Sequence, residues 1–329
     1  MAKKRFSGLS TKVYEHPFDR QALVSLEKTP LLSQILKKIN EYGIDRLLRL
    51  QSIGGDFRVT SRNFPRLHAA WNETCEILDI NPSPDLYLYQ GTGHINTYTI
   101  GVDQPVVGIN LEAMEWLSFD ELLFLLGHEV ARIKGKYLAY QQLPYVMPLL
   151  KNLISSTTLG FGGLAANGLE LALYNWIVMS KFTADRAGLL ACQEIDVAIT
   201  ALMKIGGLPG EYVNDETIPD FVKQAREFSV DHLKGLDQFT KTLSFMEYRQ
   251  PWAVMRASEL LNWVDSGVYQ ELIQGNPSDN LQSRVQDDDE NWDLSRRGMN
   301  LRNELSRRYQ AEMFQHQLKS MPLKLSNSF

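Results

Sequence analysis

One amphipathic helix, which begins at a capping box, constrains the fold of this chain more than any other segment. Ser118 and Glu121 stand three residues apart, the spacing at which each side chain can satisfy a free backbone amide at a helix start. The segment 119–140 carries apolar residues at helical spacing on one face. His128 and Glu129 fall near the middle of this predicted helix, so we expect any chemistry to lie there.

The His-Glu pair is part of a metal-binding pattern that is incomplete here. In zinc peptidases of the pattern His-Glu-x-x-His, two histidines four residues apart bind zinc from one helix face, and the Glu deprotonates the attacking water. His128 and Glu129 fit this pattern, but Arg132 stands where the second His is needed. A guanidinium has no lone pair to donate to a metal. One ligand position is therefore lost, and the pair alone would be a weak signal.

Several other motifs occur in a fixed order around this pair. They are the segments 14–20 (YEHPFDR), 84–87 (PDLY), 95–101 (INTYTIG) and 184–188 (ADRAG). Together with the His-Glu pair they resemble soluble members of the HtpX and CAAX-prenyl-protease family of zinc metallopeptidases. The resemblance extends over residues 10–270 and implies a zincin-like fold. Ordered motifs at matching spacing are much more specific than one His-Glu pair.

The resemblance also implies roles for particular residues. The family strand that lines the substrate cleft corresponds to Asn96, Thr97 and Tyr98. The family's third zinc ligand, a Glu three residues before an Ala-Asp pair, corresponds to Lys181, so a second ligand position is lost. The family Asp that supports a ligand histidine corresponds to Asp185, which we expect to hold His128 by a hydrogen bond.

A further departure from the family lies closer to the C-terminus. The family often has a His-Pro pair before a downstream Arg, and Gln250 stands at the position of that His, ahead of Arg256. We treat Arg256 as an auxiliary residue of the same site. The change at position 250 agrees with the loss of the other ligand positions.

Electrostatics predicts that zinc binding fails at this site. A His, His, Glu ligand set carries a formal charge of -1, whereas His128, Arg132 and Lys181 carry +2 with the His neutral. A divalent ion about 4 Å from one such cation meets a repulsion of roughly 8 kcal/mol at an effective dielectric constant of about 20. We expect no cofactor, and we expect Glu129 to pair with Arg132 or Lys181 instead. A rearranged zinc site built from His128, Asp185 and His94 is the alternative.

The segments predict a mainly helical α+β fold with a small antiparallel β-sheet. We expect a metallopeptidase-like domain over residues 1–274 and a charged tail over 275–329. Within the domain, the predicted segments are N-terminal helices (10–80), a cleft sheet (85–110), the motif helix (119–140), an apolar hairpin (143–179) and a second motif helix (181–205).

Composition limits the partners and the location. The net charge of -5 argues against a nucleic-acid partner. Cys75 and Cys192 lack metal or redox spacing, which is typical of reduced core thiols, and the first 20 residues carry no apolar signal segment, so we predict a cytoplasmic location. The apolar segment 143–179 leaves peripheral membrane contact as an alternative.

Three functions follow from these observations. The first is an inactive peptidase homologue that binds a protein or peptide as a scaffold or regulator. The second is an active zinc endopeptidase with an unusual ligand set, in which Glu129 is the general base. The third is a membrane-associated scaffold anchored through residues 143–179.

Overall fold

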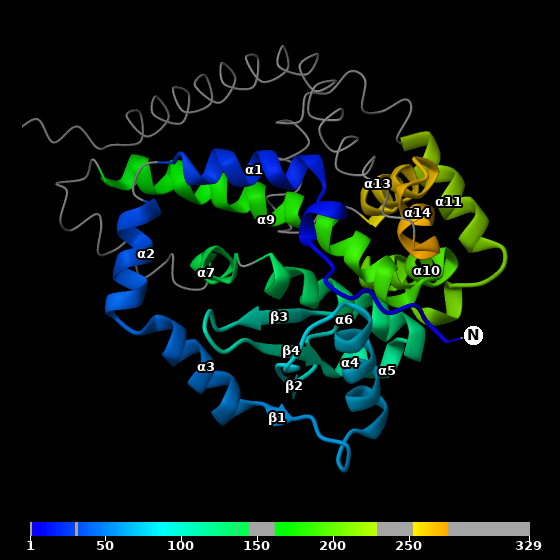
Figure 1. Cartoon of the computed structure of the whole chain (residues 1–329), viewed down its shortest axis with the longest axis horizontal. Coiled ribbons are helices and arrows are strands. Elements are labelled where there is room, and N and C mark those ends of the chain that lie inside the picture. The colour runs from blue at the N-terminus through cyan, green and yellow to red at the C-terminus, as the bar shows by residue number, and fades with distance from the viewer. Residues whose placement is uncertain (1, 30–31, 136, 145–161, 229–252, 276–329) are drawn as a thin grey trace, which may run out of the picture.

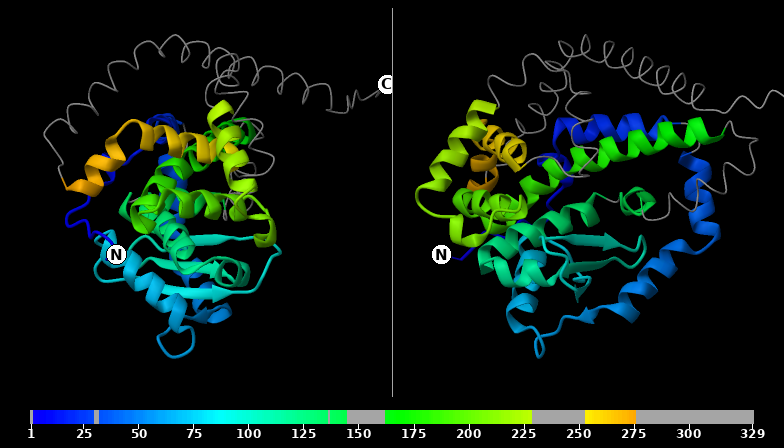
Figure 2. Two further views of the ribbon diagram at one scale, coloured as in Figure 1. Left: turned by 90° about the vertical axis from the view of Figure 1, so that its right-hand side faces the viewer. Right: turned by 180° about the vertical axis from the view of Figure 1, so that it is seen from behind.

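The computed structural model describes residues 2–29, 32–135, 137–144, 162–228 and 253–275. The described chain is mainly helical with one small four-stranded sheet, so the α+β prediction is confirmed. Helix α1 lies alongside α9 on one side of the molecule, the sheet lies on the other, and α6 runs between them (Figure 1). The helices α10, α11, α13 and α14 gather at the end opposite to α2 and α3 (Figure 2).

The helices are α1 (Pro17–Glu27), α2 (Leu32–Glu41), α3 (Ile44–Gly55), α4 (Pro65–Ile77), α5 (Leu111–Trp116), α6 (Phe119–Lys134), α7 (Leu138–Gln141), α9 (Gly162–Cys192), α10 (Ile195–Ile205), α11 (Thr217–Glu227), α13 (Ala253–Asp265) and α14 (Val268–Gln274). The strands are β1 (Phe57–Arg58), β2 (Asp85–Tyr89), β3 (Thr97–Ile100) and β4 (Val106–Asn110).

The sheet is mixed, where the sequence predicted an antiparallel one. Its strand order is β1-β2-β4-β3, and β2 pairs with β4 in parallel while the other two pairs are antiparallel. The parallel pair arises because the chain leaves β2, forms β3 at the outer position and returns through β4 between them. Strand β3 is therefore an edge strand of the described sheet, next to the motif helix α6.

The N-terminal helices form in the predicted region, with one break that was not predicted. The segment 31–50 carries apolar residues at helical spacing, yet the chain forms two helices there, α2 and α3. Gly43 lies between them with a φ of 63°, a left-handed conformation that glycine adopts at little cost.

The end of the first motif helix and the start of the second differ from the predicted positions. Helix α6 ends at Lys134, six residues before the predicted end, and the short helix α7 follows after Gly135. The second motif helix does not begin at residue 181, because α9 is continuous from Gly162 to Cys192. It ends before Gln193, which has a left-handed φ of 59°. A lysine inside a helix carries no stop signal, which is why the predicted boundary was wrong.

Other predicted segments lie partly or wholly outside the described residues. Residues 145–161 of the apolar hairpin lie outside the described residues, and so does the tail from residue 276 to 329. Within the described residues, no helix combines the length and apolar character needed to cross a membrane.

The main core joins the sheet to the helices that carry the site. Buried side chains of α4, α6, α9, α10 and α13 form one cluster with the sheet, and a second cluster joins α1, α2 and α9. Cys75 and Cys192 are both free and buried. The helices that carry the site residues therefore pack into the main hydrophobic core.

Candidate functional site

The start of α6 is fixed by the predicted capping box. The backbone N–H of Ser118 donates to Glu121 Oε2 at 2.7 Å, and the backbone N–H of Glu121 donates to Ser118 Oγ at 3.2 Å. Satisfying both amides sets where the helix begins. It thereby sets which residues of α6 face the strand β3.

Two glycines bring α6 and α9 into close contact. A Cβ atom on Gly127 would lie 2.7 Å from Ala191 Cβ, and one on Gly188 would lie 2.7 Å from the carbonyl oxygen of Phe124. Only glycines allow the two backbones to approach this closely. This crossing places His128 and Glu129 of α6 beside Lys181 and Asp185 of α9.

Glu129 is fully buried, and three side chains donate hydrogen bonds to its carboxylate. Its Oε1 accepts a hydrogen bond from Thr97 Oγ1 at 2.6 Å, and its Oε2 accepts one from Thr99 Oγ1 at 2.5 Å. Arg132 Nη1, one turn later on α6, also donates to Oε2 at 3.0 Å. The expected ion pair between Glu129 and Arg132 is present. Both carboxylate oxygens are therefore engaged by protein groups.

This environment keeps Glu129 ionised. Burial acts to raise the pKa of Glu129, but the charge of Arg132 and the contacts with His128 and Thr97 together outweigh it. The pKa of this carboxyl therefore lies well below its usual range. A buried carboxylate that is paired and hydrogen-bonded is a stable structural group.

His128 is buried, with 3% of its surface exposed, and makes no hydrogen bond within the described residues. Its Nδ1 lies 3.4 Å from Glu129 Oε1, without hydrogen-bond geometry, and its Nε2 lies 3.7 Å from Asp185 Oδ1. Burial lowers the pKa of His128 to about 4, and the charges of Arg132 and Arg256 act in the same direction. The imidazole is neutral at pH 7.

The expected hydrogen bond from Asp185 to His128 is absent because Asp185 has another partner. Arg256 of α13 donates to Asp185 through Nε at 2.9 Å and through Nη2 at 2.5 Å. Both residues are buried, and this two-bond pairing occupies both carboxylate oxygens. Arg256, an auxiliary residue in the sequence analysis, thus neutralises the Asp that was expected to orient the histidine. Gln250 lies outside the described residues.

Lys181 lies near a cluster of charged side chains, which is formed by Glu129, Arg132, Asp185 and Arg256. Burial lowers the pKa of Lys181 to about 7, and the neighbouring charges of Arg132 and Arg256 lower it further, while Glu129 and Asp185 oppose this. The side chain lines a cavity of about 30 Å³. The other lining residues are Ile95, Asn96, Thr97, Leu125, His128, Ile205 and Arg256.

The strand residues assigned to the cleft divide between two faces of β3. Thr97 points to Glu129, and Asn96 lines the cavity with it. Tyr98 lies on the other face, where its hydroxyl donates to Asp56 and its ring covers Gly108. This follows from the alternation of side chains along a strand. Tyr98 therefore does not line the cavity.

His94 is not brought into the cluster. It is exposed in the loop before β3, its Nδ1 lies 3.3 Å from the carbonyl oxygen of Thr92, and it does not line the cavity. The rearranged zinc site needs His94 beside His128 and Asp185. The described structure does not place the three together.

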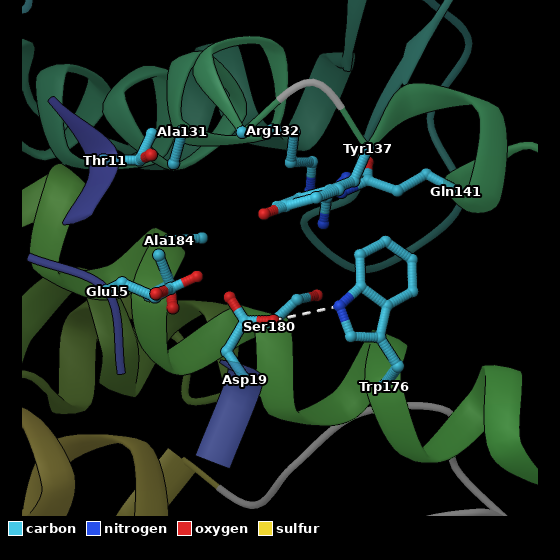
Figure 3. A pocket seen from close by; sticks show the side chains of 12 residues that line it. Thr11, Glu15, Asp19, Ala131, Arg132, Tyr137, Gln141, Trp176, Ser180 and Ala184 are labelled. Carbon is cyan, nitrogen blue, oxygen red and sulfur yellow. Dashed lines mark hydrogen bonds between the residues drawn. The ribbon is translucent and has the colours of Figure 1, made fainter. Parts of the chain in front are cut away.

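A second cavity, of about 20 Å³, is lined by Arg132 (Figure 3). Arg132 and Tyr137 line one wall, and Glu15 and Asp19 face them from the other. Asp19 Oδ1 accepts a hydrogen bond from Trp176 Nε1 at 2.9 Å. Burial raises the pKa of Asp19 to about 7 despite this bond. Arg132 therefore lines a cavity with the buried Asp19 and the partly buried Glu15.

Thr99 and the pairing of Arg256 are the parts of the site that sequence reasoning missed. The signal for Thr99 was available, because Thr97 and Thr99 are two residues apart on one strand and must share a face. The Arg256 pairing had no local signal, since 71 residues separate it from Asp185.

The residues present do not fit a catalytic zinc site. Such a site needs three protein ligands with a fourth position open. Within the described ranges, no group of three or more His, Cys, Asp or Glu side chains is placed to hold a metal. The carboxylate of Glu129 is bound by Arg132 and two threonines, and Asp185 is bound by Arg256.

A His-Glu helix, flanked by an edge strand and crossed by a second helix that carries an Asp, defines the scaffold of a metallopeptidase. Residues 61–280 match the model of peptidase family M48, and this match covers more than half of the chain. The chain belongs to peptidase family M48, which confirms the resemblance to HtpX-like metallopeptidases.

Two relatives are similar to large parts of the chain. Plastoglobule-localized metallopeptidase 48, chloroplastic, of Arabidopsis thaliana is 28% identical over 273 residues, which cover 82% of this chain and 77% of that protein. Protease HtpX homolog 2 of Methanosarcina acetivorans is 26% identical over 172 residues, covering 46% of this chain and 58% of that protein. No solved structure matches the chain.

Proposed function

We propose that this chain is a catalytically inactive member of peptidase family M48 that binds a protein or peptide as a scaffold or regulator. The observation that carries this proposal is the environment of Glu129. In an active enzyme of the His-Glu-x-x-His pattern this carboxylate must reach a metal-bound water. Here it accepts hydrogen bonds from Thr97, Thr99 and Arg132, so it is occupied as a structural group.

The charges of the cluster support the same proposal. Arg132 and Lys181 stand at two of the three ligand positions implied by the family resemblance. A guanidinium has no lone pair to donate to a metal, and neither has a lysine in its ammonium form. We therefore propose that the chain takes no zinc cofactor.

The position of β3 supports peptide binding. The backbone N–H of Asn110 donates to the Asn96 carbonyl, so by the alternation of an antiparallel ladder the backbone groups of Thr97 and Thr99 point away from β4. Edge strands of this kind can pair with an extended peptide. The Asn96 side chain already accepts the Thr97 N–H at 2.9 Å, and Thr99 is buried, so pairing would use the Thr97 carbonyl.

A cleavage assay on an unfolded protein substrate tests the loss of activity. The wild type, Glu129→Gln and the double variant R132H/K181E are compared after addition of zinc. We expect the wild type and Glu129→Gln to show the same background. Zinc-dependent cleavage by the wild type that Glu129→Gln abolishes would overturn the proposal.

The second candidate is an active zinc endopeptidase with an unusual ligand set. Membership of a metallopeptidase family favours it, as do the names of both relatives. It requires about one zinc per chain and the abolition of cleavage by Glu129→Gln. The cytoplasmic location and the contact of residues 143–179 with a membrane stay predictions.

A further inference from the structure

The cavity beside β3 has an excess of positive charge. Arg132 is paired with Glu129, and Arg256 is paired with Asp185. These two pairs cancel, so the ammonium form of Lys181 adds one positive charge to the cluster. An anion in the cavity would favour that form, because burial otherwise lowers the pKa of Lys181 to about 7. A cavity that holds zinc in an active relative would need the opposite charge. The exchange of ligands has therefore changed which ions the cavity can accept.

The cavity also presents hydrogen-bond donors that lack partners. Both ring nitrogens of His128 are buried without a hydrogen bond within the described residues, although a buried polar group normally has one. A neutral imidazole carries one N–H. The Asn96 amide oxygen accepts from Thr97, which leaves its NH₂ group as a donor. Together with the ammonium of Lys181, these groups suit an acceptor with more than one oxygen.

The size and lining of the cavity limit the charge and shape of the acceptor. About 30 Å³ is room for two water-sized atoms, which matches the two oxygens of a carboxylate. One unbalanced cation favours a monoanion over a phosphate dianion. Ile95, Leu125 and Ile205 form an apolar part of the lining, which shields the carboxylate from water. Asn96 and Lys181 are partly exposed, so the cavity is reached from solvent.

We infer that this cavity binds the C-terminal carboxylate of a peptide. Lys181 supplies the charge, His128 and Asn96 donate hydrogen bonds, and the preceding residues of the peptide lie along the edge of β3. This inference rests on the proposed function, because it names the ligand chemistry of the same noncatalytic cleft.

Fluorescence anisotropy on the full chain tests the inference. The probes are labelled hexapeptides ending in Ala, Val or Leu, each made as a free acid and as a C-terminal amide, with sodium acetate as a competitor. Charge-assisted hydrogen bonds predict that the wild type binds the free acids about tenfold or more tightly than the amides. Acetate should compete only at far higher concentration, because it lacks the peptide contacts.

Variants at two lysines separate the site from general charge effects. Lys181→Met should remove the preference for the free acid, and Lys181→Arg should retain part of it. Lys134→Met is the matched control, because Lys134 is a partly buried lysine whose Nζ bonds to the Leu78 carbonyl, outside this cavity. It should keep the full preference.

The remaining outcomes overturn the inference in distinguishable ways. Equal binding of acids and amides would refute the carboxylate site and leave peptide binding intact. A preference that Lys181→Met does not change would place the carboxylate elsewhere. Absence of all binding would refute both the inference and the peptide-binding part of the proposed function.

Discussion

The guanidinium of Arg132 lies 3.0 Å from the carboxylate of Glu129, where the family pattern has a metal ligand and a general base. The pair sits on one helix face at a spacing of three residues, which brings the two side chains together. Two threonines of β3 complete the contacts of Glu129. An internal ion pair therefore occupies the motif that gives active relatives their chemistry.

Removing Arg132 should destabilise the fold, because it leaves a buried charge without its partner. We expect Arg132→Met to lower the free energy of unfolding by about 3–5 kcal/mol. Removing both charges with Glu129→Leu and Arg132→Met should restore much of this loss. Urea unfolding of the two single variants and the double variant measures the coupling. Additive losses would contradict an interaction between the two side chains.

Thr99→Val should reveal how much the strand contributes to holding Glu129. The variant keeps the shape of the side chain and removes a hydrogen bond to an ionised carboxylate, so we expect a loss of about 1.5–3 kcal/mol. Thr200→Val is the control, since the Thr200 hydroxyl bonds to the neutral carbonyl of Val197. Its loss should be smaller, and equal losses in thermal or urea unfolding would argue against a charged acceptor.

Asp19→Asn should change how stability depends on pH. Burial raises the pKa of Asp19 from 3.8 to about 7, so the folded chain binds a proton more tightly than the unfolded chain does. The associated stability is fully present below about pH 4 and is lost as the pH rises to about 7. Asparagine stays neutral and can still accept the Trp176 hydrogen bond.

The variant should therefore match the wild type near pH 4 and exceed it at pH 8. The upper limit of the gain is roughly 4 kcal/mol, the free energy that corresponds to the change in pKa. Unfolding by urea at several pH values measures it, with the exposed Asp220→Asn as control. A constant difference across the pH range would show that Asp19 does not titrate in this window.

Gly127→Ala should separate α6 from α9 and displace His128 and Glu129. The added Cβ would lie 2.7 Å from Ala191 Cβ and 3.0 Å from Gly188 Cα, so we expect a loss of about 1–3 kcal/mol. Gly54→Ala on α3 meets no atom within 4 Å and should be neutral or stabilising, by about 0.4–1 kcal/mol. Differential scanning calorimetry compares the two, and equal effects would refute the close crossing.

Local sequence signals predicted much of the site, and long-range pairings account for what they missed. The capping box placed His128 and Glu129 on their helix, and the lost ligand at 132 correctly indicated the ion pair. The bond from Asp185 to His128 was wrong, because Arg256 competes for the same carboxylate across 71 residues. A short stretch of sequence gives no sign that Arg256 competes with His128 for Asp185.

The same holds for the fold. Short sequence patterns predicted some of its features, and other features depend on contacts between distant segments. The position of the sheet followed from local signals, and β2, β3 and β4 all lie within the predicted range 85–110. The parallel pairing of β2 with β4 depends on the path of the chain between them, which alternation does not encode. The uninterrupted course of α9 through Lys181 depends on packing against α6 and α1, which does not appear in a single segment.

Zinc content tests the central claim most directly. Elemental analysis compares the wild type with the double variant R132H/K181E, both purified without chelator. The variant restores the His, His, Glu ligand chemistry that the family resemblance implies. We predict no stoichiometric zinc in the wild type and about one zinc per chain in the variant. About one zinc per wild-type chain would contradict the account and make an unconventional metallopeptidase the leading interpretation.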